Sequence, residues 1–168
     1  MAMDSYLVRL RKELEDVLAD ATGRSLTQAP PGKWNSGQIL EHLFLSYKGT
    51  NRGLARCLEK GAPLATQATL RHRLQTLVVV TVGYMPDGVK APQVAVPCGV
   101  PSEEVRSTII DEIRTMESGL DECERRFGPW TKIMDHPILG PLTADQWRKL
   151  HWVHGRHHAK QIRERRRV

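Results

Sequence analysis

The chain has 168 residues, of which 40% are hydrophobic and 26% are charged, a balance that excludes extended disorder and suits one domain over residues 1–168. Its most apolar run, Leu77 to Val82, is far shorter than the roughly 20 residues that a membrane-spanning helix needs. The formal net charge of +6 arises largely at the end of the chain, from Arg156, Arg163, Arg165, Arg166 and Arg167.

The first third of the chain predicts two helices. Apolar residues recur at spacings of three and four over about residues 4–21, which indicates an amphipathic helix that ends at Gly23. Glycines and a proline pair follow, so we expect a connection there. Asn35 or Ser36 then caps a second helix that runs to about Leu58, because a short side-chain oxygen accepts the free amide protons of a first turn.

The middle of the chain is less regular. Residues 70–84 fit a short helix by their apolar spacing and a strand by their run of β-branched residues. Four prolines and two glycines make residues 85–101 a long irregular loop. Ser102 and the two acidic residues after it predict the capped start of a third helix, which runs to Phe127.

The last part of the chain predicts a loop and a fourth long helix. We interpret residues 130–141 as a loop, because of their prolines and glycines. Thr143 and Gln146 form a capping box that opens a helix extending to about Arg165. The predicted class is therefore all-α, a four-helix bundle with a long irregular crossover between its second and third helices. Four tryptophans are expected to be packing anchors: Trp34, Trp130, Trp147 and Trp152.

Histidines form the most informative pattern. On the last helix, His151, His154 and His158 fall on the apolar face, and the last two have the i, i+4 spacing at which a helix chelates one metal ion. His42 on the second helix supplies a third ligand, which leaves a position open for water or substrate. The ordinary alternative is a set of hydrogen-bonded core histidines. We predict a divalent-metal site at His42, His154 and His158, with His151 or His157 as alternative ligands.

We expect the other reactive residues to have structural roles rather than chemical ones. Gln161 lies one turn beyond His158, and we favour packing over a role in orienting the ligand. Glu41 points away from His42, so we expect a solvated or helix-pairing carboxylate rather than a general base. Two histidines look like surface or loop residues: His72 and His136. Three widely spaced cysteines are expected to be buried thiols: Cys57, Cys98 and Cys123. Their spacing and the absence of an export signal favour a reducing cytoplasm.

Two segments of the chain resemble the signature regions of the DinB and YfiT-like superfamily. One is WNSGQILEHL at residues 34–43, and the other is HGRHHAKQI at residues 154–162. The segment HPILGPLT at residues 136–143, which leads into the last helix, is similar to an uncharacterised branch of the superfamily. The resemblance covers about residues 30–165.

The resemblance implies a four-helix bundle with up-down-down-up topology and often a homodimer. It implies a divalent metal, commonly nickel or zinc, held by His42, His154 and His158. Members of the superfamily include thiol-dependent S-transferases and a mycothiol-dependent isomerase, in which the metal activates a low-molecular-weight thiol. We therefore expect a metal-dependent transferase or hydrolase that acts on a small molecule, with a thiol as the candidate co-substrate.

Two alternative functions remain open at this point. One is a metal-bound helical scaffold without turnover, which the same three ligands would serve. The other is nucleic-acid binding through the basic end of the chain. The second alternative is disfavoured, because no recognition helix or aromatic platform accompanies the arginines.

Overall fold

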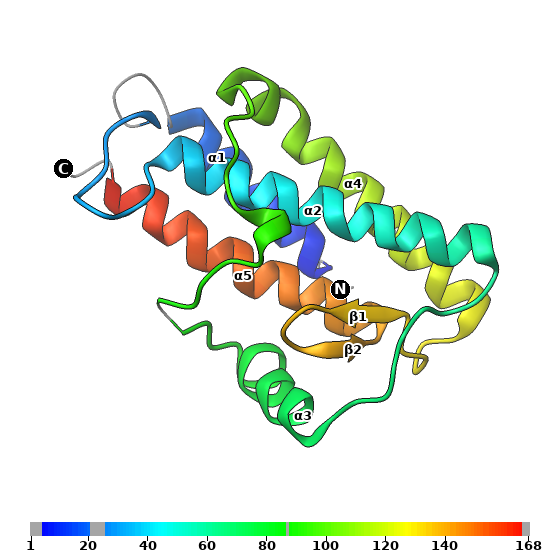
Figure 1. Cartoon of the computed structure of the whole chain (residues 1–168). Helices are drawn as coiled ribbons and strands as arrows, with labels where there is room; N and C mark the ends of the chain where they lie inside the picture. The colour runs from blue at the N-terminus through cyan, green and yellow to red at the C-terminus, as the bar shows by residue number, and fades with distance from the viewer. Residues whose placement is uncertain (1–4, 21–25, 87, 166–168) are drawn as a thin grey trace.

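The computed structural model describes residues 5–20, 26–86 and 88–165, and it is mainly helical with one small hairpin (Figure 1). The long helices are α1 (Tyr6–Asp20), α2 (Ser36–Lys60), α4 (Ser102–Phe127) and α5 (Ala144–Arg165). The shorter elements are α3 (Leu70–Thr76), β1 (Met134–His136) and β2 (Gly140–Leu142). The predicted helical class and the four long helices are confirmed. Three residues named above lie outside the described ranges: Gly23, Arg166 and Arg167.

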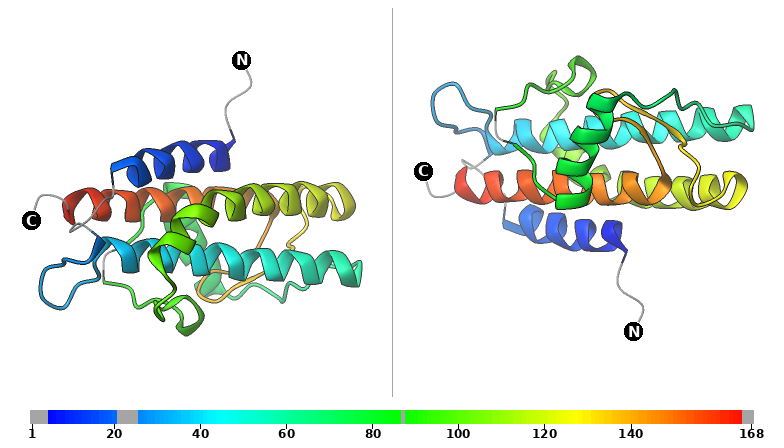
Figure 2. Two further views of the ribbon diagram at one scale, coloured as in Figure 1. Left: turned by 90° about the horizontal axis from the view of Figure 1, so that it is seen from above. Right: turned by 90° about the horizontal axis from the view of Figure 1, so that it is seen from below.

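The long helices run in two opposite directions. Figure 2 shows α1 and α5 running one way, and α2 and α4 running the other. Near the starts of α5 and α1, the Lys149 ammonium lies over the Tyr6 ring, 6.0 Å from its centroid. Near the ends of α4 and α2, Arg126 donates a hydrogen bond to the Leu58 carbonyl. The segment between α2 and α4 thus returns the chain to the end of the molecule at which α2 begins.

Each long helix turns an apolar face toward a common core. Its members include Leu10, Leu14, Leu43, Tyr47, Ile109, Ile113, Leu120, Leu150 and Ile162. Each large apolar side chain contributes about 1.5–3 kcal/mol when fully buried, so this core holds the helices together. Gly155 lets α5 approach α1 closely, because a Cβ at this position would lie 2.1 Å from Leu10 Cδ1.

Two of the three predicted helix caps are confirmed. The Asn35 side chain accepts a hydrogen bond from Gln38 N at 2.8 Å, and Gln38 Oε1 accepts one from Asn35 N at 3.0 Å. Thr143 and Gln146 form the same reciprocal pair at the start of α5. The prediction that Ser102 caps α4 is wrong, since this residue is already helical and the cap position before it makes no side-chain hydrogen bond.

The hairpin corrects the loop predicted over residues 130–141. β1 and β2 pair antiparallel, with Met134 opposite Leu142. The Gly140 and Pro141 of β2 are typical of turns by sequence, and only the pairing of β2 with β1 makes this segment a strand. Trp130 beside the hairpin is 89% exposed, so its prediction as a packing anchor is also wrong.

The segment between α2 and the crossover loop is helical. α3 continues into a π-helical turn at Leu77–Val82, so the strand alternative is wrong. One face of this segment is apolar and exposed, and its members are Leu70, Leu74, Leu77, Val78, Val82 and Tyr84. We call this surface the α3 face. Within the described residues, every helix is too short or too polar to cross a bilayer.

Candidate metal centre

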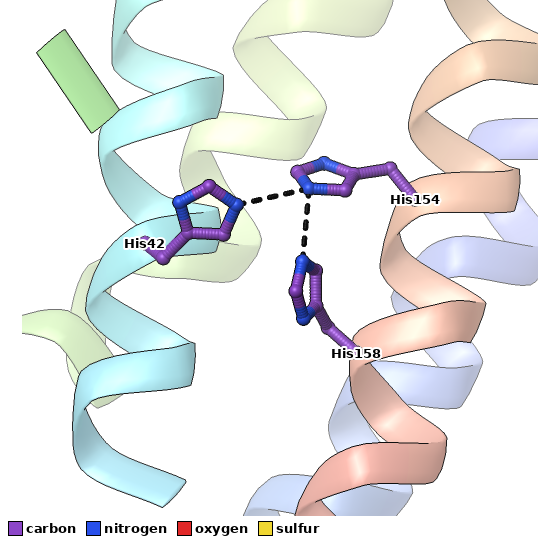
Figure 3. A group of neighbouring side chains, drawn as sticks. All are labelled: His42, His154 and His158. Atoms are coloured by element: carbon purple, nitrogen blue, oxygen red, sulfur yellow. Dashed lines mark hydrogen bonds between the residues drawn. The ribbon is translucent and has the colours of Figure 1, made fainter. Parts of the chain in front are cut away.

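Three imidazoles from two helices meet between α2 and α5 (Figure 3). His154 Nε2 lies 3.0 Å from His42 Nε2 and 3.0 Å from His158 Nε2. One ligand atom from each of the three residues lies within 4.8 Å of the others. Nitrogens about 2.1 Å from a shared ion are about 3.0 Å apart at right angles and about 3.4 Å apart in a tetrahedron. The two separations from His154 Nε2 therefore match those of nitrogens around a single ion, and the cluster could hold one.

The surrounding elements decide where these side chains point. α2 and α5 run antiparallel, so His42 near the start of one helix reaches the level of the pair near the end of the other. The i, i+4 spacing puts His154 and His158 on one side of α5. The Trp34 ring packs beside the His42 ring, with 5.2 Å between centroids. His42 is 4% exposed and His158 is 9% exposed, so both ligands are largely out of water.

Two hydrogen bonds define which ring nitrogens carry protons. His42 Nδ1 lies 2.7 Å from the Ala95 carbonyl oxygen, and His158 Nδ1 lies 2.8 Å from Gln161 Oε1. Both oxygens can only accept, so each Nδ1 carries a proton. A neutral imidazole has one proton, which leaves a lone pair on Nε2 of His42 and of His158. Both lone pairs point toward His154.

The cluster has too few protons for the lone pairs that meet in it. His154 Nε2 can carry at most one proton, which it can donate to only one neighbour. At least one of the Nε2 lone pairs of His42 and His158, each 3.0 Å from His154 Nε2, is therefore left without a donor. A buried polar atom without a partner costs about 1–3 kcal/mol. A divalent cation between the three Nε2 atoms would satisfy all of them at once.

Burial keeps these imidazoles neutral. It lowers the pKa of His42, against the opposing effect of the hydrogen bond to Ala95. Burial, together with the neighbouring imidazoles, lowers the pKa of His154 well below the ordinary value. Burial, followed by the effect of His42, lowers the pKa of His158 to about 3. Near neutral pH all three side chains are in the neutral form that binds metal ions.

Gln161 contacts the site directly. Its Oε1 accepts the His158 Nδ1 proton, and its Nε2 lies 3.0 Å from His157 Nε2. The interpretation as a packing residue is therefore incomplete. The i, i+3 spacing from His158 was the sequence signal for this contact, because it places the amide on the same side of α5.

Glu41 anchors the loop that covers His42. Its Oε1 accepts three backbone N–H groups, those of Cys98, Gly99 and Val100, at 2.7, 2.8 and 2.9 Å. Burial raises the pKa of this carboxyl, but the three hydrogen bonds outweigh it and lower the pKa. The side chain is 4% exposed, so the expectation of a solvated carboxylate is wrong. A loop contact 57 residues away has no local sequence signal.

The alternative ligands do not join the cluster. Thr50 Oγ1 donates to the Ser46 carbonyl, so His151 Nε2 donates to Thr50 Oγ1 at 3.0 Å. Burial lowers the pKa of His151 to about 3. His157 Nε2 faces the Gln161 amide instead. Across the described ranges, the side chains grouped closely enough to hold a metal ion are those of His42, His154 and His158.

The remaining predictions concern cysteines and two histidines, and the structure confirms only some of them. Cys57 and Cys123 are buried as expected, whereas Cys98 is exposed, and all three are free thiols. His136 was expected at the surface or in a loop, but it lies in β1, is only partly exposed, and burial lowers its pKa to about 4. Its Nδ1 accepts hydrogen bonds from two backbone amides of the hairpin turn. His72 lies partly exposed on α3.

The fold and the site together define a mainly helical protein with a largely buried three-histidine cluster that could hold one metal ion. The chain belongs to the family described as "Protein of unknown function (DUF1569)", whose model matches residues 10–165. No curated protein and no solved structure matches the chain.

Proposed function

We propose that this protein binds one divalent metal ion, nickel or zinc, through the Nε2 atoms of His42, His154 and His158. The observation that carries the proposal is the proton count, since three neutral imidazoles converge with too few protons to satisfy their lone pairs. Nitrogen ligands suit both metals. The Ala95 carbonyl and the Gln161 amide orient the rings of His42 and His158 by accepting hydrogen bonds from their Nδ1 atoms, as is usual for histidine ligands.

We further propose that the chain is a four-helix bundle of the DinB and YfiT-like type. Two observations support this proposal. The helix directions in chain order, with α2 and α4 opposite to α1 and α5, agree with the topology that the resemblance implies (Figure 2). The clustered histidines come from the two segments that carry the resemblance, residues 34–43 and 154–162.

The proposed activity is that of a metal-dependent transferase or hydrolase that acts on a small molecule, with a low-molecular-weight thiol as the candidate co-substrate. A divalent ion with an open coordination position lowers the pKa of a water or thiol that binds to it. Three protein ligands leave such a position. His154 is partly exposed, so the cluster is not sealed from solvent on its side. The principal alternative is a metal-bound scaffold without turnover.

A cobalt-substituted protein separates these two functions. If a thiol is the co-substrate, adding a small thiol such as 2-mercaptoethanol is expected to produce a sulfur-to-cobalt charge-transfer band in the near ultraviolet. Thiol consumption with an alkylating electrophile should then rise above the rate of the metal-free protein. Neither signal should appear with the His42→Ala variant. A cobalt spectrum that no thiol changes, with no hydrolysis of a nitrophenyl ester, would favour the scaffold.

The homodimer belongs to the same proposal, and we assign its interface to the α3 face. Its six apolar side chains are between 40% and 73% exposed along one continuous segment. An apolar surface of this kind marks an interaction site, and two copies related by a twofold axis would cover it. Six such side chains supply much of the roughly 800 Å² that each partner of a stable complex buries.

Sedimentation velocity tests the interface. We expect the wild-type chain to sediment as a dimer and the Leu74→Lys/Val82→Lys variant as a monomer with an unchanged helical circular-dichroism spectrum, because buried lysines repel across the interface. Val94→Lys is the matched control, since Val94 is 78% exposed outside the α3 face. A monomeric wild type, or a dimer that survives the double substitution, would contradict the assignment.

A further inference from the structure

A second candidate site lies at the other end of α5 from the metal centre. A cavity of about 430 Å³ opens between α3, the hairpin and the start of α5. Its lining includes side chains from all three elements, among them Arg73, Lys132 and Gln146. None of the three clustered histidines lines it. The cavity is larger than a single inorganic ion requires, so it has room for a small organic molecule.

Lys132 is the feature that points to a ligand. Its side chain is partly buried, and burial lowers its pKa. In the part of the chain that the structure describes, no carboxylate lies within ion-pair distance of Lys132. Its hydrogen-bond partner is Gln146 Oε1, which also accepts from Thr143 N as part of the α5 cap. A partly buried cation that faces only a neutral amide favours binding of an anion.

Two further donors surround the same space. Arg73 supplies a guanidinium group, which matches the two oxygens of a carboxylate or phosphate. His72 Nδ1 lies 3.4 Å from Thr69 N and accepts its proton, which leaves the other ring nitrogen, Nε2, as a donor. None of the described residues that line the cavity is acidic. The electrostatic character of the cavity is therefore positive.

The hairpin holds this arrangement in place. Gly140 has φ of +69°, and a Cβ at this position would lie 2.2 Å from His72 Nδ1. Only glycine therefore lets the hairpin approach α3 so closely. Thr76 Oγ1 donates to the Leu139 carbonyl at 3.2 Å and ties the same two elements together. The cavity walls are thus held by these contacts between α3 and the hairpin rather than by Lys132 and Arg73.

We propose that this cavity binds the oxyanion group, carboxylate or phosphate, of a small molecule, with Lys132 and Arg73 as its charged donors. The apolar side chain of Leu139 in the lining would contact the rest of the molecule. The site is independent of metal binding, because it shares no side chain with the histidine cluster.

Isothermal titration calorimetry of the metal-loaded protein at low salt tests the proposal, with inorganic phosphate and succinate as the two probes. We expect at least one probe to bind, and Lys132→Gln and Arg73→Gln each to weaken its affinity by about tenfold or more. The probe that binds more tightly identifies the oxyanion. Arg52→Gln is the matched control, because Arg52 is exposed on α2 and does not line the cavity.

A second variant distinguishes this cavity from the metal centre. His154→Ala should retain the binding of the probe. The proposal is overturned if neither probe binds to the wild type, or if both pocket variants bind as the wild type does. Binding that is lost in His154→Ala and kept in Lys132→Gln and Arg73→Gln would place the anion on the metal and also overturn it. Arg73 is exposed, so Arg73→Gln keeps the test decisive should Lys132→Gln fold poorly.

Discussion

Replacing His154 with alanine is expected to abolish stoichiometric metal binding. His154 Nε2 lies 3.0 Å from the ligand nitrogens of both other histidines, so it is the member that joins the cluster. Its loss leaves two imidazoles from different helices. We expect protein purified without a histidine tag to contain about one nickel or zinc ion per chain, and the variant to bind about a hundredfold more weakly or worse. Elemental analysis and competition with a chelating dye measure both quantities.

Thermal denaturation supplies an independent readout of the same site. A ligand that binds only the folded state stabilises it by RT ln(1 + [L]/Kd), about 2.7 kcal/mol at a hundredfold excess over Kd. Added metal should therefore raise the melting temperature of the wild type and leave that of His154→Ala unchanged. His72→Ala is the control, since this imidazole lies on α3 outside the cluster. Wild-type metal content in the His154→Ala protein would refute the proposed site.

Replacing Glu41 with glutamine is expected to weaken both the fold and the metal site. The substitution keeps the shape of the side chain but removes the negative charge from the group whose Oε1 accepts three backbone N–H groups. Hydrogen bonds to a charged acceptor contribute about 1.5–3 kcal/mol each, and the amide oxygen restores part of this, so we expect a loss of about 1–3 kcal/mol in the free energy of unfolding. Denaturant titration measures this loss.

The effect on the metal is indirect. Glu41 fixes residues 98–100, and the same loop carries the Ala95 carbonyl that holds His42 Nδ1. A looser loop should orient His42 less well and lower metal affinity by about tenfold, as loss of contacts behind a ligand commonly does. Glu59→Gln is the matched control, because Glu59 is exposed on the same helix. An unchanged affinity in Glu41→Gln would show that the loop does not position His42.

Several features of the site were predictable because they depend on periodicity within one helix. The i, i+4 pair His154 and His158 follows from the geometry of α5 alone, and the apolar stripe around it showed that the pair faces inward. His42 was a weaker prediction, since its place depends on how α2 packs against α5. Gln161 was identified on the correct side of the helix, but its hydrogen bond to His158 was not favoured.

Features that depend on distant contacts were missed. The hairpin exists because residues 134–136 pair with residues 140–142, although Gly140 and Pro141 are typical of a loop. Glu41 was expected to be solvated or to pair along its helix, because no residue near it in the sequence predicts a contact with the backbone amides of residues 98–100. The cavity at Lys132 likewise arises only where α3, the hairpin and α5 meet.

The sequence by itself determined the four long helices, two of their caps and the inward direction of the histidine pair on α5. These properties follow from the spacing of side chains on a helix and from hydrogen bonds between residues three or four apart. Only the tertiary structure decided that the His42 ring meets those of His154 and His158, which tautomer the His42 ring adopts, and which loop covers His42. These depend on packing between segments more than 50 residues apart, for which no local pattern exists.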